Sequence, residues 1–403
     1  MRKNRNGVLL FIFILILIFP ELLPSSEEQE ILALKGAKVH TAASPPIPSA
    51  VVLIREGKIL EVGSKVAIPQ GATIIDLEGK EIIPGLIDEH SHIGSYFDVN
   101  EFTQPLGPEN RALDALNLDD EDWYEALKGG VTTVVTGPGS GERMGGQSVT
   151  IKTWGKDPLQ RILKESREAK MAVNARDLSH IPSIRKMFYK ALEYKDKWEK
   201  YEASEKKGAP PEKDLALEAL VPVLEGKEKL RLHVHFANDM LTFLRLKDEF
   251  GFDLTFIHSS EAYKIAREIA KRKVPVITLP LATRIPVCDE MLLGIKELFE
   301  AGVKVSLHTD HPVVHQKLLR LNAGMAIRYG VPEEEALKMV TLNPAQSSKI
   351  NSRVGSIEKG KDADLVVLNG VWYQPRTRVE MVFVDGTLAY DRANEEKFKE
   401  ERK

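Results

Sequence analysis

Eight short apolar runs between residues 84 and 350 constrain the fold of this chain most strongly. Each run is long enough for one buried strand, and stretches with helical patterning separate the runs. We expect strands at Gly85–His92, Val131–Thr136, Ser148–Thr153, Met171–Ala175, Leu230–Phe236, Leu254–His258, Val274–Leu279 and Val303–His308. Strands that are apolar throughout are typical of a parallel sheet covered by helices. Because the segment is close to the roughly 250 residues typical of this architecture, the pattern predicts an α/β fold, a (β/α)₈ TIM barrel at residues 84–350.

The two ends of the chain carry a different pattern, in which short β-like runs alternate with turns. Residues 27–83 include the runs Ala50–Ile54 and Lys58–Gly63, with Gly57 in the hairpin turn between them. Residues 351–403 include Asp364–Leu368 and Val379–Gly386, followed by a charged tail. We expect both ends to pair into one small β-sandwich. The charged stretch Lys186–Asp214 predicts a solvated, helix-rich insertion between the fourth and fifth barrel strands.

The first residues have the features of a targeting segment. Arg2, Lys3 and Arg5 precede an unbroken apolar run from Val8 to Phe19. That run is shorter than the roughly 20 residues of a membrane-spanning helix. The pattern predicts a signal peptide at residues 1–26, and an N-terminal anchor formed by residues 8–23 is the alternative. Both interpretations place the bulk of the protein outside the cytoplasm, secreted or periplasmic.

Composition narrows the classes of function. The 403 residues include 56 Lys+Arg and 59 Asp+Glu, a formal charge of −3. This balance argues against a nucleic-acid-binding protein, which needs a basic face. The single cysteine, Cys288, excludes an internal disulfide and any cysteine-rich zinc module. We therefore expect a small-molecule substrate as partner; a membrane tether through the N-terminal segment and a homo-oligomer both stay open.

Histidines and one carboxylate lie at the carboxyl ends of the predicted strands. They are His90 and His92 on the first strand, His233 and His235 on the fifth, His258 on the sixth, and Asp310 after the eighth. Residues two apart on a strand point to the same face, so each histidine pair projects together. Active sites of TIM barrels lie at this end of the strands. Imidazoles and a carboxylate that converge there predict a site for a divalent cation such as Zn²⁺.

Several motifs resemble those of the amidohydrolase superfamily. Residues 84–92 read Pro-Gly-Leu-Ile-Asp-Glu-His-Ser-His, which is similar to the signature of that superfamily. Further matching motifs lie at Thr341–Ala345 and Gly355–Leu365, and those that resemble the imidazolonepropionase-like branch lie at Gly130–Ser140, Gly145–Gln147 and Leu307–Val313. The resemblance implies a metal-dependent hydrolase of carbon–nitrogen bonds, built as a barrel with a sandwich from both chain ends.

The resemblance also implies roles for individual residues. The residues that match metal ligands of the family are His90, His92, His233, His258 and Asp310. Asp310 is further expected to take a proton from water and deliver it to the leaving nitrogen. The metal ion, together with His235 or His258, is expected to stabilise the developing oxyanion. His235 is a candidate for the rim or for substrate contact. Lys152, near the end of the third predicted strand, is a candidate partner for a substrate carboxylate, and a solvated lysine at the rim is the alternative.

The fourth predicted strand departs from the family pattern. Many relatives bridge two metal ions with a carbamylated Lys or a Glu of this strand, but Ala175 stands where the Glu is expected. Lys170 lies at the strand start with the opposite parity, which makes it a poor candidate for the carbamate. Asp177, two residues after Ala175, is expected to point to the same face of the strand and remains a candidate to reach the metal site. A further departure is Asn238, at a position where relatives often have an acid.

We therefore expect one metal ion per chain rather than two, most simply zinc. The main alternative to the enzyme is a non-catalytic metal- or ligand-binding barrel that has lost its bridging acid. A third class, an interaction protein that uses the charged insertion, also stays open.

Overall fold

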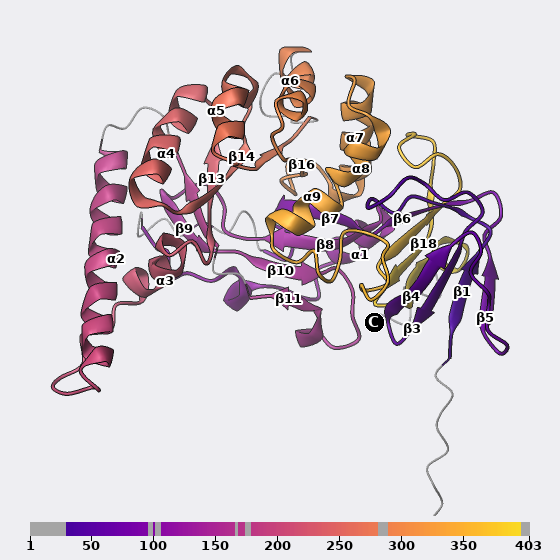
Figure 1. The fold of residues 1–403 in the computed structure, drawn as a ribbon, viewed down its shortest axis with the longest axis horizontal. Helices are drawn as coiled ribbons and strands as arrows, with labels where there is room; N and C mark the ends of the chain where they lie inside the picture. Colours follow the sequence, from indigo (N-terminus) through magenta and orange to yellow (C-terminus); the bar gives the residue numbers. More distant parts are fainter. Residues whose placement is uncertain are drawn as a thin grey trace, which may run out of the picture.

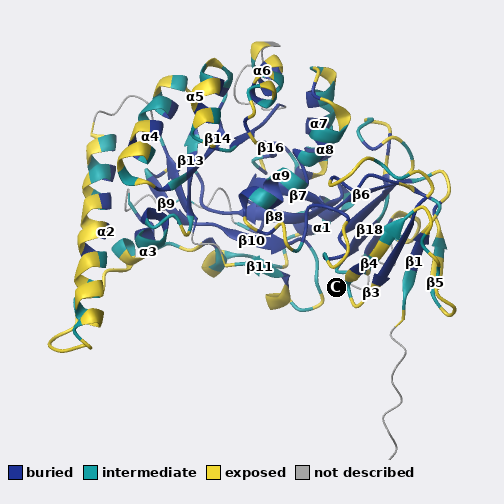
Figure 2. Ribbon diagram, in the orientation of Figure 1, coloured by how far each residue is buried: buried dark blue, intermediate teal, exposed yellow. Residues whose placement is uncertain are grey.

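The computed structural model describes residues 30–95, 100, 106–165, 168–173, 179–280 and 289–395. A central α/β part is flanked on one side by two smaller sheets (Figure 1). Buried residues follow most strands of both parts, and exposed residues lie on the outer faces of the helices (Figure 2). The predicted leader, Ala175, Asp177, Cys288 and the last eight residues lie outside the described residues.

The central strands occupy all eight predicted positions. Their bounds are β7 Leu86–Ser91, β8 Val131–Thr136, β9 Met144–Gln147, β10 Val149–Lys152, β11 Ile162–Lys164, β12 Ala169–Ala172, β13 Lys229–Val234, β14 Asp253–His258, β15 Val276–Thr278 and β16 Val305–Leu307. They form two sheets, in the orders β11-β10-β8-β7 and β16-β15-β14-β13-β12-β9. Strands β12 to β16 pair in parallel, as do β7 and β8. Within the described residues, hydrogen bonding does not join the two sheets into one closed ring.

The third predicted strand, β10, runs in the opposite direction to that expected. It pairs antiparallel with β8, with Val149 opposite Thr136 and Lys152 opposite Thr133. A parallel neighbour needs a long crossover, usually a helix. Here the chain between β8 and β10 is short and contains β9, which itself pairs antiparallel with β12. Lys152 therefore lies beside the amino end of β8 rather than at the carboxyl ends of the strands.

Helices lie along the upper side and at the left end of the central strands, as Figure 1 shows. Their bounds are α1 Asp122–Lys128, α2 His180–Ala203, α3 Leu215–Leu224, α4 Ala237–Phe250, α5 Ala266–Lys271, α6 Asp289–Glu300, α7 Leu319–Arg328, α8 Glu333–Lys338 and α9 Leu342–Ser347. Most of the charged insertion is the long helix α2, as the sequence predicted. Helix α4 ends at Gly251, whose φ of 78° suits a residue without a side chain. In the described part of the chain, none of the helices has the length and apolar character needed to cross a membrane.

The two ends of the chain meet in the flanking sheets. Their strands are β1 Leu32–Lys35, β2 Lys38–Val39, β3 Val51–Arg55, β4 Lys58–Gly63, β5 Thr73–Asp76, β6 Glu81–Pro84, β17 Leu365–Leu368, β18 Val379–Val384 and β19 Thr387–Asp391. One sheet has the order β4-β3-β1-β5 and the other β19-β18-β17-β6-β2. Strand β6 pairs antiparallel with β17, which joins the N-terminal to the C-terminal segment. Leu34 and Val52 of the first sheet share a hydrophobic core with Ile82, Leu365 and Phe383 of the second.

Candidate metal centre

Two histidines of β7 and the carboxylate that follows β16 form the centre of the site. The Asp310 Oδ1 atom lies 3.2 Å from His90 Nε2 and 3.3 Å from His92 Nε2. One ligand atom from each of these three residues lies within 4.8 Å of the other two, so a single cation can contact all three. This arrangement arises because β7 and β16 both point their carboxyl ends to the same side.

Three further predicted histidines gather beside this group. The His258 ring lies 5.4 Å from the His90 ring and 4.3 Å from the His233 ring, centroid to centroid. The His235 ring stacks on His258 at 5.2 Å and 22°. His258 Nε2 is 4.0 Å from Asp310 Oδ2. All five predicted metal ligands and the predicted contact His235 therefore form one cluster.

Outer hydrogen bonds fix the orientation of these rings. His92 Nδ1 donates to the carbonyl of Gly137 at 2.8 Å. His233 Nδ1 lies 2.8 Å from the Ser140 hydroxyl, and His235 Nδ1 lies 2.9 Å from the Ser260 hydroxyl. Partners of this kind are typical of metal-binding histidines, because they hold one ring nitrogen and present the other to the ion. Neither Ser140 nor Ser260 has a role that the sequence alone predicts.

The electrostatics suit a cation. Burial, reinforced by the nearby Lys170 charge, holds the pKa of His90 and of His233 well below the ordinary value. Burial and the neighbouring His233 do the same for the pKa of His258. Burial alone would raise the pKa of Asp310, but the adjacent imidazoles of His258, His90 and His92 lower that pKa well below its usual range. Neutral imidazoles and an ionised carboxylate are the forms that bind metal ions, so the donor set fits a divalent cation.

Lys170 also reaches the centre, which corrects its interpretation from the sequence. Its Nζ lies 3.4 Å from His90 Nε2 and 3.4 Å from the Pro138 carbonyl, and the residue is 1% exposed. The direction of the Lys170 side chain was mispredicted because it was counted from Ala175. In the sheet, Lys170 is paired with Arg231 and Ala172 with His233, so Lys170 has the same parity as the histidines of β13.

Lys152 has a different environment from the one predicted. Its ammonium group is buried against three carboxylates, at 2.8 Å from Asp362, 2.9 Å from Asp364 and 2.6 Å from Asp385. The antiparallel direction of β10 places it beside Thr133, at the end of the strands opposite to the histidines. The prediction that Lys152 contacts substrate is therefore wrong.

Three further histidines lie near the cluster or in the loop after β16. The His308 ring, fully buried, is 4.9 Å from the His258 ring. His311 Nε2 lies 2.9 Å and His315 Nε2 3.8 Å from the Asp122 carboxylate. Asn238 is exposed in the first turn of α4.

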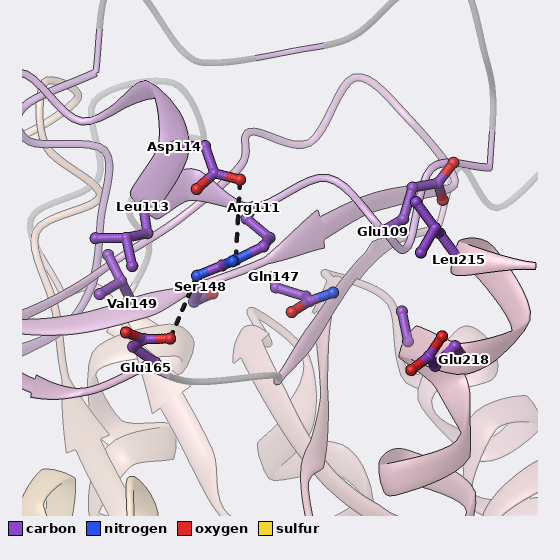
Figure 3. A pocket seen from close by; sticks show the side chains of 11 residues that line it. Glu109, Arg111, Leu113, Asp114, Gln147, Ser148, Val149, Glu165, Leu215 and Glu218 are labelled. Atoms are coloured by element: carbon purple, nitrogen blue, oxygen red, sulfur yellow. Dashed lines mark hydrogen bonds and ion pairs between the residues drawn. The ribbon is translucent and has the colours of Figure 1, made fainter.

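A separate cavity of about 380 Å³ lies beside the β9–β10 connection and the start of α3 (Figure 3). Arg111 crosses it and forms ion pairs with Glu165 and Asp114. The predicted site residues are absent from its lining, which includes Glu109, Gln147 and Glu218. The cavity therefore does not coincide with the histidine cluster.

The sequence and the fold are similar to those of known proteins. The profile of the amidohydrolase family matches residues 82–389. A crystal structure of an amidohydrolase from Thermotoga maritima MSB8 superposes with a TM-score of 0.84 and 36% identity, over 90% of this chain and all of that one. An imidazolonepropionase of Thermoplasma volcanium is 23% identical over 87% of this chain and 92% of its own length. The amidohydrolase tasK of Hapsidospora irregularis is 26% identical over 84% of this chain, which spans only 40% of that relative.

These similarities confirm the resemblance to amidohydrolases and to the imidazolonepropionase-like branch, and they imply a TIM-barrel-like α/β fold. The extent of the profile match and the identity to the Thermotoga structure lead to one conclusion, that this chain belongs to the amidohydrolase family.

Proposed function

We propose that this protein hydrolyses an amide, cyclic amide or dipeptide-like bond of a small molecule, with the help of a divalent metal ion, outside the cytoplasm. Membership of the family supports a metal-dependent hydrolase of carbon–nitrogen bonds. The observation that carries the proposal is the position of the Asp310 carboxylate, within 3.3 Å of two histidine nitrogens at the carboxyl ends of the strands. The proposed location rests on the basic and apolar residues at positions 2–19.

The residues of the centre have different proposed roles in hydrolysis. His90, His92 and Asp310 would hold the divalent ion, most simply zinc, which would supply Lewis acidity when bound. Asp310 is ionised and accepts a proton from the attacking water, then delivers it to the leaving nitrogen. His235, held by Ser260 on the outer side of His258, is placed to contact the substrate.

Lys170 decides how many ions the centre holds. An ammonium group 3.4 Å from His90 Nε2 repels a cation bound there. Carbamylation of the amine would replace this positive charge with a carboxylate. We propose that the Lys170 amine adds CO₂ and loses a proton to form a carbamate, and that this carbamate, His233 and His258 would together hold a second ion. This replaces the sequence-based expectation of a single ion, which assumed that Lys170 points away.

The first experiment measures activity against metal content. Chelated protein should lose hydrolysis of a panel of N-acyl amino acids, dipeptides and cyclic amides, and Zn²⁺ or Mn²⁺ should restore it. Full activity in protein that elemental analysis shows to be metal-free would contradict the proposal. A metal-loaded protein that is inert on the whole panel, as inert as its Asp310→Asn variant, would favour the non-catalytic alternative.

The second experiment counts ions. Wild-type protein reconstituted with bicarbonate should hold two ions per chain, and Lys170→Met should hold one. Lys170→Arg is the matched control, because it keeps the cation and cannot form the carbamate; it should also hold one. A single ion in the wild type would return the site to the mononuclear form, with His258 as a hydrogen-bond donor to the substrate.

A further inference from the structure

Asp88 is a buried carboxylate inside the segment that carries the metal ligands. It lies in β7, two residues before His90, and is 0% exposed. Its Oδ1 accepts hydrogen bonds from the backbone amides of Thr309 at 3.2 Å and His90 at 3.3 Å. Its Oδ2 accepts from the Thr309 hydroxyl and from Gln316 Nε2, the latter at 3.2 Å. A buried carboxylate is costly unless such bonds satisfy it, and here four donors do so.

These bonds connect the two segments that supply the first metal site. Thr309 immediately precedes Asp310, and Gln316 follows in the same loop and also donates to Ser91 Oγ at 3.0 Å. The Asp310 amide donates to the His90 carbonyl at 3.1 Å. Asp310 itself has a φ of 54°, in the left-handed region that is costly for a residue with a side chain unless its surroundings hold it there.

We propose that Asp88 is a positioning residue that sets where the Asp310 carboxylate stands relative to His90 and His92. The inference rests on the proposed role of Asp310 as ligand and proton carrier. Asp88 accepts hydrogen bonds from both the amide and the hydroxyl of Thr309, the residue before Asp310. These bonds hold the start of the Asp310 loop against β7, the strand that carries His90 and His92. Displacements of about 1 Å at a catalytic group cost up to roughly a hundredfold in rate, so this anchor acts on catalysis as well as on folding.

The hydroxyl of Thr309 provides a test with a matched control. Thr309→Val removes one buried donor from Asp88 and keeps the shape of the side chain. Thr153→Val removes an equivalent donor, because the Thr153 hydroxyl is also fully buried and bonds the Val131 carbonyl at 2.8 Å. Thr153 lies beside Lys152, at the end of the strands opposite to the histidines. Thr309→Ser keeps the hydroxyl, and Asp88→Asn keeps the size of the acceptor while replacing one of its oxygens with a donor.

Four measurements are made on each metal-loaded variant: unfolding temperature, Co²⁺ affinity, the visible spectrum of the Co²⁺ form, and kcat with KM. Thr309→Val and Asp88→Asn should lower Co²⁺ affinity and kcat by about 10- to 100-fold, leave KM near the wild-type value and alter the spectrum. Thr309→Ser should restore wild-type behaviour. Thr153→Val should lose a similar amount of thermal stability while it keeps wild-type affinity, spectrum and kcat.

The inference is wrong if Thr309→Val behaves like Thr153→Val in affinity, spectrum and kcat, or if Asp88→Asn keeps the wild-type spectrum and affinity. These outcomes differ from a failure of the proposed function. In that case the wild type itself would be inert with metal bound, whereas Co²⁺ affinity and the spectrum would still report whether Asp88 positions Asp310.

Discussion

At the scale of single residues, Asp310 carries the most chemistry in the site. Asp310→Asn keeps the shape of the side chain but removes the carboxylate that we propose to accept the proton of water. We expect kcat to fall by about 10²- to 10⁴-fold, the usual contribution of a general base. Steady-state kinetics on the best substrate of the panel would measure this change.

Asp239→Asn offers a control for the loss of a carboxylate near the carboxyl end of β13. Asp239 lies in the first turn of α4, half-buried, and does not contact the histidine cluster through any bond described above. This variant should keep the kcat of the wild type. Equal losses in both variants would show that Asp310 has no special role in proton transfer.

The sequence predicted the histidines of the site because their positions depend on a simple rule. His90 and His92, two residues apart on one strand, must share a face, and the carboxyl ends of parallel strands meet. Lys170 was misjudged because the direction of its side chain was counted along the sequence from Ala175, a residue outside the described part of the chain. Its true parity comes from the pairing of Ala172 with His233, which only the fold reveals.

At the scale of elements, the connection from β8 to β9 supports the metal centre. Gly137 accepts from His92, the Pro138 carbonyl lies against Lys170, and Ser140 bonds His233. The connection therefore contacts His92, Lys170 and His233. A Gly-rich stretch after a strand end was visible in the sequence, but its contacts were not.

Ser140→Ala tests this support. Loss of the hydroxyl leaves the His233 ring free to rotate, so we expect metal affinity to fall by about 10- to 100-fold. Ser260→Ala is the matched variant, because it removes the same group from His235, which we assign to substrate contact. It should raise KM and leave metal affinity unchanged. If both variants lost metal equally, His235 would belong among the ligands.

The direction of β10 could not be predicted from its residues. A short buried strand has the same apolar pattern whether its neighbour is parallel or antiparallel. Only the missing crossover between Thr136 and Val149 signalled the reversal, and the Gly-rich stretch there was interpreted as a family motif. The error at Lys152 follows directly from this reversal.

At the scale of the whole molecule, Lys152 links the central part to the C-terminal segment. Its ammonium group, 1% exposed, meets Asp362, Asp364 and Asp385, which lie next to β17 and β18. Lys152→Met would leave these carboxylates without their buried cation. We expect the free energy of unfolding to fall by about 3–5 kcal/mol, with kcat and KM unchanged in the folded protein. Urea unfolding and steady-state kinetics measure the two effects.

Lys58→Met is the matched control, because Lys58 also pairs with Asp362 but its side chain is 49% exposed. An exposed pair contributes little, so the loss should stay within about 1 kcal/mol. A raised KM in Lys152→Met at wild-type stability would instead support a role in substrate binding.

The ion pairs of Lys152 with these carboxylates predict that the free energy of unfolding depends on pH. Burial raises the pKa of Asp362, but the charge of Lys152 and its hydrogen bonds lower it more, from 3.8 to about 2. The unfolded chain therefore takes up the proton first. The contribution of Asp362, about 2 kcal/mol, is complete above about pH 4 and is lost as the pH falls toward 2. Burial raises the pKa of Asp364, which opposes this trend.

Unfolding free energies of wild type and Asp362→Asn, measured between about pH 5 and pH 3, isolate this carboxyl. The wild type should lose more stability on acidification than the variant does. Parallel curves for the two proteins would show that Asp362 does not titrate as its ion pairs require.

The pairing of β6 with β17 also bears on the time course of synthesis. Strand β6 is made early, but its neighbour β17 follows only after the whole central part. At roughly 5–20 residues per second, the edge of β6 waits for tens of seconds for its partner. An unpaired strand edge of apolar residues is a template for wrong partners. Because both chain ends share one sheet, the free edge of β6 stays exposed during synthesis until β17 pairs with it. During this interval a chaperone could shield that edge from wrong partners.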